Sequence, residues 1–355
     1  EAARPLGVIG CLAAGFEVVG RYLWLITLPA LLDLFLWLGP RLSVVPLLQG
    51  FTAILRSRPV YDPEVVHQVG QATQLLEQFS EQLNLFSLLG VLPLLEVPSL
   101  LAWHAAVTPS PLGEPSVLLV TNVLTLIGWS GVLVLVGSVL GFLYLNSLAN
   151  RVRAMPSAGE QGATPAKPAP NPAVKPTAGT GEGAEGTEQG QSFPARSGVS
   201  KLVRVLIFTA GLLMTGMVLA LPWAVLVGTA TAVSQLLAEV VLIVSTGMAG
   251  YVLLHLLFVV HGVLLGGRGL LRAIWESAVM IHMHLPYVIV LMLLVVVIYE
   301  GLGYVWSLLP GDSWLLLIGV LGNGAIATAL IAATFVFYQE RIGLLPGARQ
   351  VSAKT

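Results

Sequence analysis

Long apolar stretches recur along the whole chain and set its organisation. A helix needs about 20 mostly apolar residues to cross a bilayer. Six segments meet this need: Tyr22–Leu38, Val117–Leu145, Leu202–Val227, Val233–Leu265, Leu285–Leu308 and Trp314–Tyr338. The second and fourth are longer than the hydrocarbon core requires, so they should tilt or project beyond it. The pattern predicts an all-α, polytopic membrane helix bundle with about six transmembrane helices plus amphipathic interfacial helices.

One further segment, Asn84–Trp103, is apolar enough to enter the membrane. It carries Pro93, Glu96 and Pro98, and two prolines and an acid within six residues make a straight span poor. We interpret it as a broken or re-entrant segment, or as an outer helix packed on the bundle. If it crossed the bilayer, the part of the chain before it would have the opposite orientation.

The connection 41–114 carries two amphipathic patterns. PEVVHQVGQATQLLEQFSEQLNLF has apolar residues at helical spacing, and its polar face holds Glu64, Glu77 and Glu81 without Lys or Arg. An anionic face does not suit anionic lipid, so this helix is expected to pack on the outer end of the bundle or on a partner. LSVVPLLQGFTAILRSR, just before it, predicts a second short interfacial helix.

Two other stretches share a pattern: GCLAAGFEVVGRYLWLITLP and GLLRAIWESAVMIHMHLP. Each begins with Gly, reaches an aromatic–Glu pair and enters a predicted span close to a proline. Both predict an interfacial amphipathic helix that leads into a transmembrane helix. The similarity fits either an internal repeat or the shared physics of membrane entry.

A Pro/Ala/Gly-rich stretch divides the chain into two membrane halves. Residues 154–200 have almost no large apolar side chains and cannot offset the entropy of ordering, so they predict a disordered linker. It separates an N-terminal half, 1–153, with two spans and the outer segment 41–114, from a C-terminal half, 201–345, with four spans. Residues 346–355 form a tail.

Composition and charge support this class and give an orientation. The 355 residues are 56% hydrophobic and 10% charged, whereas soluble domains carry about 25% charged residues. The net charge of −1 gives no sign of nucleic-acid binding, and one cysteine, Cys11, permits no internal disulfide. With both termini inside, 14 of the 17 basic residues lie on the cytoplasmic side and 3 outside. The sequence predicts a multi-pass protein of a bacterial cytoplasmic membrane.

Ionisable residues inside apolar segments are candidates for function. At 1.5 Å per residue, Asp33 lies about 18 Å beyond Arg21, and His255 about 20 Å beyond Arg268, so the two could pair. Glu300 lies about 24 Å beyond His284. These three could form a polar pathway for protons or a cationic substrate, or each could satisfy a kink or a polar neighbour; the second interpretation is favoured. Other polar candidates are Glu239, near the outer boundary, and Asn323.

The histidines give a weaker hypothesis. His261 could meet His282 or His284 near the inner surface, and intramembrane histidines can hold haem iron or a metal. The spacing does not match a metal motif, so no cofactor or metal is predicted. The sequence shows no catalytic triad, nucleotide loop or zinc spacing, and no catalytic residue is assigned.

Small residues mark places where helices touch. Gly137 and Gly141 form a GxxxG pattern, and Gly247, Gly322 and Gly324 lie in later spans. Internal packing is favoured over dimerisation for all of them.

Three stretches carry a family resemblance: GFEVVGRYLWLITLPALLDLF, LLRAIWESAVMIHMHLPYVIVLMLL and TALIAATFVFYQERI. They resemble uncharacterised bacterial six-helix membrane proteins of the glycerophosphodiester phosphodiesterase membrane-domain type. The resemblance implies a non-catalytic membrane module and assigns no site residues. The expected function is therefore a scaffold, assembly or accessory subunit of a membrane complex, with lipid and membrane proteins as partners. The alternative is a transporter or channel-like protein that uses the polar pathway.

Overall fold

The computed structural model describes residues 5–57, 63–103, 108–155 and 195–344. Helices dominate these residues, and the short strands β1 (Arg41–Ser43) and β2 (Val117–Leu119) form a parallel pair. Five helices of the described ranges are long and apolar enough to cross a membrane, and a bent helix pair near the N-terminus provides a sixth candidate. The predicted all-α polytopic bundle is confirmed.

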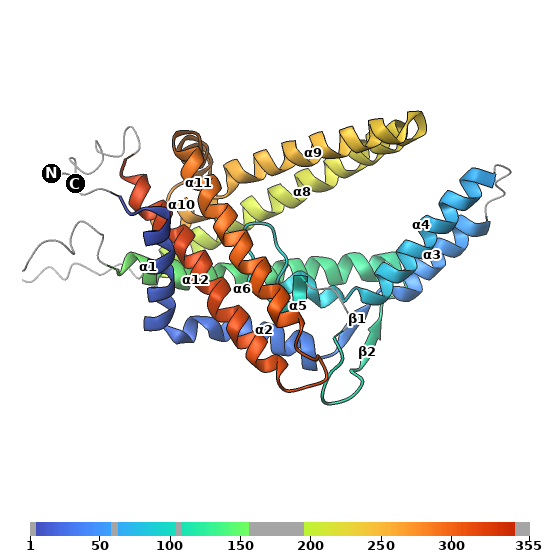
Figure 1. Ribbon diagram of the computed structural model, residues 1–355, viewed down its shortest axis with the longest axis horizontal. Coiled ribbons are helices and arrows are strands. Elements are labelled where there is room, and N and C mark those ends of the chain that lie inside the picture. Colours follow the sequence, from blue (N-terminus) through green and yellow to red (C-terminus); the bar gives the residue numbers. More distant parts are fainter. Residues whose placement is uncertain (1–4, 58–62, 104–107, 156–194, 345–355) are drawn as a thin grey trace, which may run out of the picture.

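The first candidate span is preceded by a sharp bend. Helix α1 (Val8–Arg21) meets the 3₁₀ helix η1 (Leu23–Ile26) and helix α2 (Thr27–Leu38) at 94°, because Tyr22 leaves the helical region of φ and ψ. Pro29 follows in the first turn of α2, where a missing N–H breaks no helical bond. The sequence predicted this arrangement of a lateral helix that leads into a span (Figure 1).

Five further candidate spans are formed by six helices. They are α6 (Val123–Arg153), α8 (Ala195–Val233), α9 (Gln235–Leu256) with α10 (Val259–Gly266), α11 (Leu270–Ser307) and α12 (Leu316–Ile342). Helix α6 begins at Val123 and not at the predicted Val117, because residues 117–119 pair with β1. Helix α11 bends at His284, just before Pro286, whose ring cannot continue the helical hydrogen bonding.

The molecule has two distinct ends (Figure 1). At the terminal end, the N–H of Leu6 donates to Glu340 Oε2 at 3.3 Å, and Arg341 donates to the Leu6 carbonyl oxygen at 3.2 Å. At the other end, called the hairpin end, α3 (Val45–Ser57) and α4 (Pro63–Gln82) form an antiparallel hairpin that projects beyond the rest of the bundle.

The segment 84–103 is broken and enters the bundle without crossing it. It forms the 3₁₀ helix η2 (Leu85–Leu89) and the short helix α5 (Leu100–Trp103). The β1–β2 pairing joins the chain before this segment to the chain after it, so both of its ends lie at the hairpin end. The predicted broken form of this segment is confirmed, and its place relative to a membrane stays a prediction.

The core is centred on α12, whose side chains Phe335, Phe337 and Tyr338 are buried. Helices α8 and α9 diverge from the other long helices toward the hairpin end (Figure 1). Helix α8 begins at Ala195, before the predicted boundary at 201. Residues 156–194, most of the predicted linker, and the tail 346–355 lie outside the described residues, so the predicted domain limits stay predictions.

Candidate functional site

Asp33 is a fully buried cap. Its Oδ1 accepts hydrogen bonds from the Ser99 hydroxyl and from the N–H of Leu101 at 3.1 Å, and its Oδ2 accepts from the N–H of Leu100 at 3.0 Å. The Ser99 hydroxyl oxygen in turn accepts from the N–H of Ala102 at 3.0 Å. The first N–H groups of a helix have no partner within the helix. The carboxylate of α2 therefore satisfies the start of α5 and fixes the broken segment inside the bundle.

Tyr299 of α11 extends this polar cluster. Its hydroxyl donates to the carbonyl oxygen of Ser99 at 3.5 Å and also interacts with the side chain of Asn323. Asn323 is buried in α12. The predicted polar residues Asp33 and Asn323 thus meet around a tyrosine that the sequence analysis did not single out.

Glu300 and Glu96 line one cavity of about 220 Å³. Its other walls come from Tyr299, from Pro98 of the broken segment and from apolar side chains of α11 and α12. Glu300 was a predicted candidate, whereas Glu96 was noted only as an obstacle to a straight span. The arrangement places two carboxylates and one phenol at the same cavity.

The two remaining polar candidates lie elsewhere. The ring of His255 in α9 contacts that of Tyr251 in a tilted arrangement, with 4.2 Å between ring centroids, and its Nδ1 lies 2.8 Å from the Tyr251 carbonyl oxygen. The structure therefore does not bring His255 to Asp33, whose carboxylate binds the start of α5. Glu239 is exposed at the hairpin end of α9 and accepts a hydrogen bond from Gln235 at 3.3 Å.

The three other candidate histidines have different surroundings. His261 is buried in α10, with Nε2 2.9 Å from the Thr334 hydroxyl oxygen and its ring 4.0 Å from that of Phe335. His282 and His284 lie at the bend of α11, the first exposed and the second half-buried. No group of three metal-binding side chains occurs within the described ranges.

The predicted packing glycines divide into contact and non-contact positions. A β-carbon on Gly141 would overlap the carbonyl oxygen of Leu95, and one on Gly137 would lie 3.0 Å from the carbonyl oxygens of Leu88 and Leu89. Because these two glycines have no side chain, the backbone of the broken segment can lie directly against α6. In α12, a β-carbon on Gly322 would lie 2.8 Å from Trp306 and one on Gly324 3.5 Å from Pro29. At Gly247 a β-carbon would meet no described atom within 4 Å.

The projecting hairpin has a polar seam between its two helices. Thr52 and Arg56 of α3 both donate to Glu77 of α4, at 3.2 and 3.1 Å, and Arg56 Nε also donates to Thr73 Oγ1 at 3.3 Å. Thr52 and Thr73 are 2% and 0% exposed. We call this hairpin of α3 and α4 the arm. Its two helices are joined by hydrogen bonds and an ion pair between polar side chains.

Four large apolar side chains of the hairpin lie on its exposed surface. A helix turns 100° per residue, so Ile54 lies opposite Thr52 and Leu75 lies opposite Thr73. Leu75 is 65% exposed, and Phe51, Ile54 and Phe79 are also exposed. We call these four residues the arm face. The apolar side of α4 was expected to pack on the bundle or on a partner; Phe79, a member of that side, remains exposed in the described structure.

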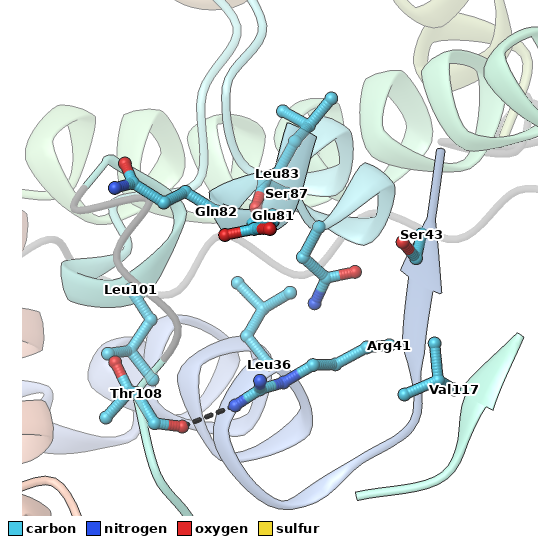
Figure 2. A pocket seen from close by; sticks show the side chains of 11 residues that line it. Leu36, Arg41, Ser43, Glu81, Gln82, Leu83, Ser87, Leu101, Thr108 and Val117 are labelled. Atoms are coloured by element: carbon cyan, nitrogen blue, oxygen red, sulfur yellow. Dashed lines mark hydrogen bonds between the residues drawn. The ribbon is translucent and has the colours of Figure 1, made fainter. Parts of the chain in front are cut away.

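A pocket of about 190 Å³ lies at the base of the arm (Figure 2). Arg41 extends from β1 into it and donates to the Thr108 carbonyl oxygen, while Glu81 and Gln82 lie on the opposite wall. Burial lowers the pKa of Arg41, because the charged guanidinium loses part of its hydration. The pocket can accept a small polar group, with Arg41 as its cationic wall.

Sequence reasoning missed the polar seam, Glu96 and the Arg41 pocket. Thr52, Arg56 and Thr73 do have a signal, because they recur at helical spacing on two consecutive amphipathic patterns. It does not by itself predict a buried polar contact, because the apolar side of an amphipathic helix is normally the buried one. Arg41 and Thr108 are far apart in sequence, and nothing local predicts their contact.

Searches of protein-family models, curated proteins and solved structures found no match. The resemblance to six-helix membrane modules therefore stays a prediction.

Proposed function

We propose that the chain is a non-enzymatic scaffold or accessory subunit of a bacterial cytoplasmic membrane complex, which binds a protein partner through the α3–α4 arm. Both termini lie in the cytoplasm in this proposal, and the arm lies on the outer side. The orientation is supported by the 14-to-3 split of basic residues. Several of the described basic residues lie at or next to helix ends that belong to the terminal end of the molecule: Arg21, Arg153, Lys201, Arg268 and Arg341.

The inverted polarity of the arm carries this proposal. Two isolated helices in water would bury their apolar sides against each other, because burial of one large apolar side chain stabilises by about 1.5–3 kcal/mol. Here the buried Thr52 and Thr73 lie in the seam with the partly exposed Arg56–Glu77 ion pair beside them, and the arm face is exposed. An exposed apolar face on a projecting element is typical of a surface that another molecule covers.

The Arg41 pocket supplies a polar contact at the base of the same arm. A partly buried guanidinium is stabilised by an anion that replaces its lost hydration. We therefore expect the partner to combine an apolar surface for the arm face with an acidic group near Arg41. Arg41 itself is held in place by the Thr108 carbonyl oxygen.

A photocross-linking amino acid at Leu75 in the full chain, in cells that make it, tests this proposal. We expect a protein adduct. Co-purification of that protein should fall at least about tenfold in Phe79→Gln, because one buried apolar side chain is lost from the interface. Leu112→Gln, at an exposed apolar position of the same end but off the arm, should leave it unchanged.

Three results would contradict the proposal. Adducts that contain only lipid would assign the arm face to the membrane surface. Adducts of the chain with itself would assign it to self-association. Equal recovery of the protein with Phe79→Gln and Leu112→Gln would show that the arm face does not hold it.

The second candidate function is transport of protons or a small cation, favoured by the cavity shared by Glu96 and Glu300. In reconstituted vesicles, Glu300→Gln should abolish any ion flux that the protein supports, while Glu239→Gln, the same change at a residue that does not line this cavity, should preserve it. Flux that is equal in both variants would reject this function.

A further inference from the structure

Basic side chains from two helices meet at the terminal end, where α10 stops. Arg153 of α6 and Lys201 of α8 both donate to the carbonyl oxygen of Leu264, at 2.8 and 2.9 Å. Arg204 of α8 donates to the carbonyl oxygen of Gly267 at 2.8 Å. The last carbonyl groups of a helix point out of it and carry partial negative charge. They hold three cations within one small region.

This region keeps a net positive charge. The nearby acid is Glu276, which already pairs with Arg268 at 2.8 Å and with Arg272 at 2.7 Å. Within the described residues, no acidic side chain forms an ion pair with Arg153, Lys201 or Arg204. The end of a helix offsets only about half of one charge, so the three cations are not neutralised by the carbonyl groups.

A cavity of about 180 Å³ opens beside these cations, lined by Arg153, Arg268, Tyr338 and Gln339 among others. Tyr338 is only 2% exposed, yet its hydroxyl has no hydrogen-bond partner in the described part of the chain. The same holds for Oε1 of Gln339, whose amide can rotate to present its two N–H groups instead. A buried polar group normally has a partner, and the Tyr338 hydroxyl can donate to a ligand that accepts hydrogen bonds.

The position of the cavity relative to the apolar segments indicates the headgroup layer. Lys201 directly precedes the apolar stretch that begins at Leu202, and Arg153 follows the one that ends at Leu145. Phosphate is the anion of that layer, and guanidinium groups match its oxygens in charge and geometry. A single phosphate group is small enough for this cavity.

We propose that the cavity between α6, α10 and α12 binds the phosphate group of an anionic phospholipid. Arg153 supplies a positive charge without an acidic partner among the described residues, Arg268 lines the cavity while paired with Glu276, and the Tyr338 hydroxyl donates to a phosphate oxygen. A zwitterionic lipid is disfavoured, because its ammonium group would lie near the cations. This proposal does not depend on the arm or on its partner.

Tyr338→Phe tests the site directly, because it removes a hydroxyl that makes no described hydrogen bond within the chain. The purified full chain in a neutral detergent would be titrated with phosphatidylglycerol, phosphatidylcholine or sodium phosphate, and bound lipid counted by native mass spectrometry. We expect preference for phosphatidylglycerol, and about tenfold weaker binding in Tyr338→Phe, the usual effect of losing a hydrogen bond to a charged group. The lipid-free variant should unfold at the same temperature as the parent or higher.

Matched variants separate the site from general attraction to lipid. Tyr304→Phe makes the same change at an exposed position of the hairpin end and should leave lipid binding unchanged. Arg153→Gln should weaken phosphatidylglycerol binding, whereas Arg21→Gln, which removes an exposed charge of α1 at the terminal end, should not.

The outcomes decide both the site and the source of the phosphate. Saturable binding of sodium phosphate that Tyr338→Phe weakens would support the phosphate site and identify free phosphate as a ligand. Equal phosphatidylglycerol binding by the parent and Tyr338→Phe would overturn the proposal. Binding of phosphatidylcholine as tight as that of phosphatidylglycerol would overturn it as well.

Discussion

Replacement of Asp33 by Asn tests whether this residue is a structural cap or a member of a polar pathway. Asn has the same shape but keeps one acceptor oxygen and places an NH₂ group where Oδ2 stood. The N–H of Leu100, now 3.0 Å from Oδ2, would face a donor, and the bonds from Ser99 and Leu101 would lose the carboxylate charge. A hydrogen bond to a charged group contributes about 1.5–3 kcal/mol. The loss of one such bond and the weakening of two others predicts a destabilisation of about 2–4 kcal/mol.

The assay is denaturant-induced unfolding of the purified protein in detergent, followed by tryptophan fluorescence. Glu239→Gln is the matched control, because it makes the same chemical change at an exposed residue and should shift the free energy of unfolding by less than about 0.5 kcal/mol. Ser99→Ala should be destabilising by itself, and its effect should be smaller in the Asp33→Asn background, because the two side chains share a hydrogen bond.

The cap interpretation is refuted if Asp33→Asn unfolds like Glu239→Gln. Loss of ion flux in reconstituted vesicles, with unchanged stability, would instead assign Asp33 to a pathway. The two interpretations therefore predict opposite combinations of stability and flux.

Two further predictions follow from packing and from the arm. Gly141→Ala should destabilise the fold by at least about 2 kcal/mol, because its methyl group would overlap the backbone of Leu95, and that backbone cannot move without displacing the broken segment. Gly247→Ala, the control, should be neutral or slightly stabilising in thermal unfolding. Equal effects of the two substitutions would contradict the contact between Gly141 and Leu95. A double-mutant cycle of Arg56→Gln and Glu77→Gln should give a coupling of about 0.5–1 kcal/mol, since the pair is partly exposed; zero coupling would mean that the ion pair does not join the seam.

Segment-level features of this fold were predictable from sequence because the bilayer imposes a simple length and hydropathy rule. The spans in α8, α9, α11 and α12 and the lateral helix before α2 follow from apolar length and proline position. The start of α6 was misplaced because Val117–Leu119 is apolar but pairs as a strand with β1. Pairing between residues so far apart has no local signal.

The candidate site was predictable as a set of residue types but not as a set of partners. Asp33 and Glu300 stand out because charges inside apolar segments are costly. Which groups they meet depends on the path of the broken segment, which brings Ser99 to one and Glu96 to the other. His255 was placed with Asp33 by depth alone, and depth does not determine which side of a helix faces the bundle.

The arm shows how far hydrophobic periodicity reaches. The apolar periodicity of α4 correctly predicted an amphipathic helix. Burial of that apolar side within the chain did not follow, because Thr73 and Glu77 pair with α3 through hydrogen bonds. Hydrophobic periodicity predicts the helix, but it does not determine whether the apolar side of that helix packs on the bundle or on another molecule.

The central claim is that the arm lies outside the membrane and that a partner covers its apolar face. Cysteine labelling with a membrane-impermeant maleimide tests both parts, on a Cys11→Ser background that removes the native thiol. In intact cells, Gln71→Cys, at an exposed polar position of α4, should be labelled, whereas Leu75→Cys, one turn further along the helix, should be protected. After purification both should be labelled equally. Labelling of Gln71→Cys only after permeabilisation would contradict the orientation, and equal labelling of both positions in intact cells would contradict the covered face.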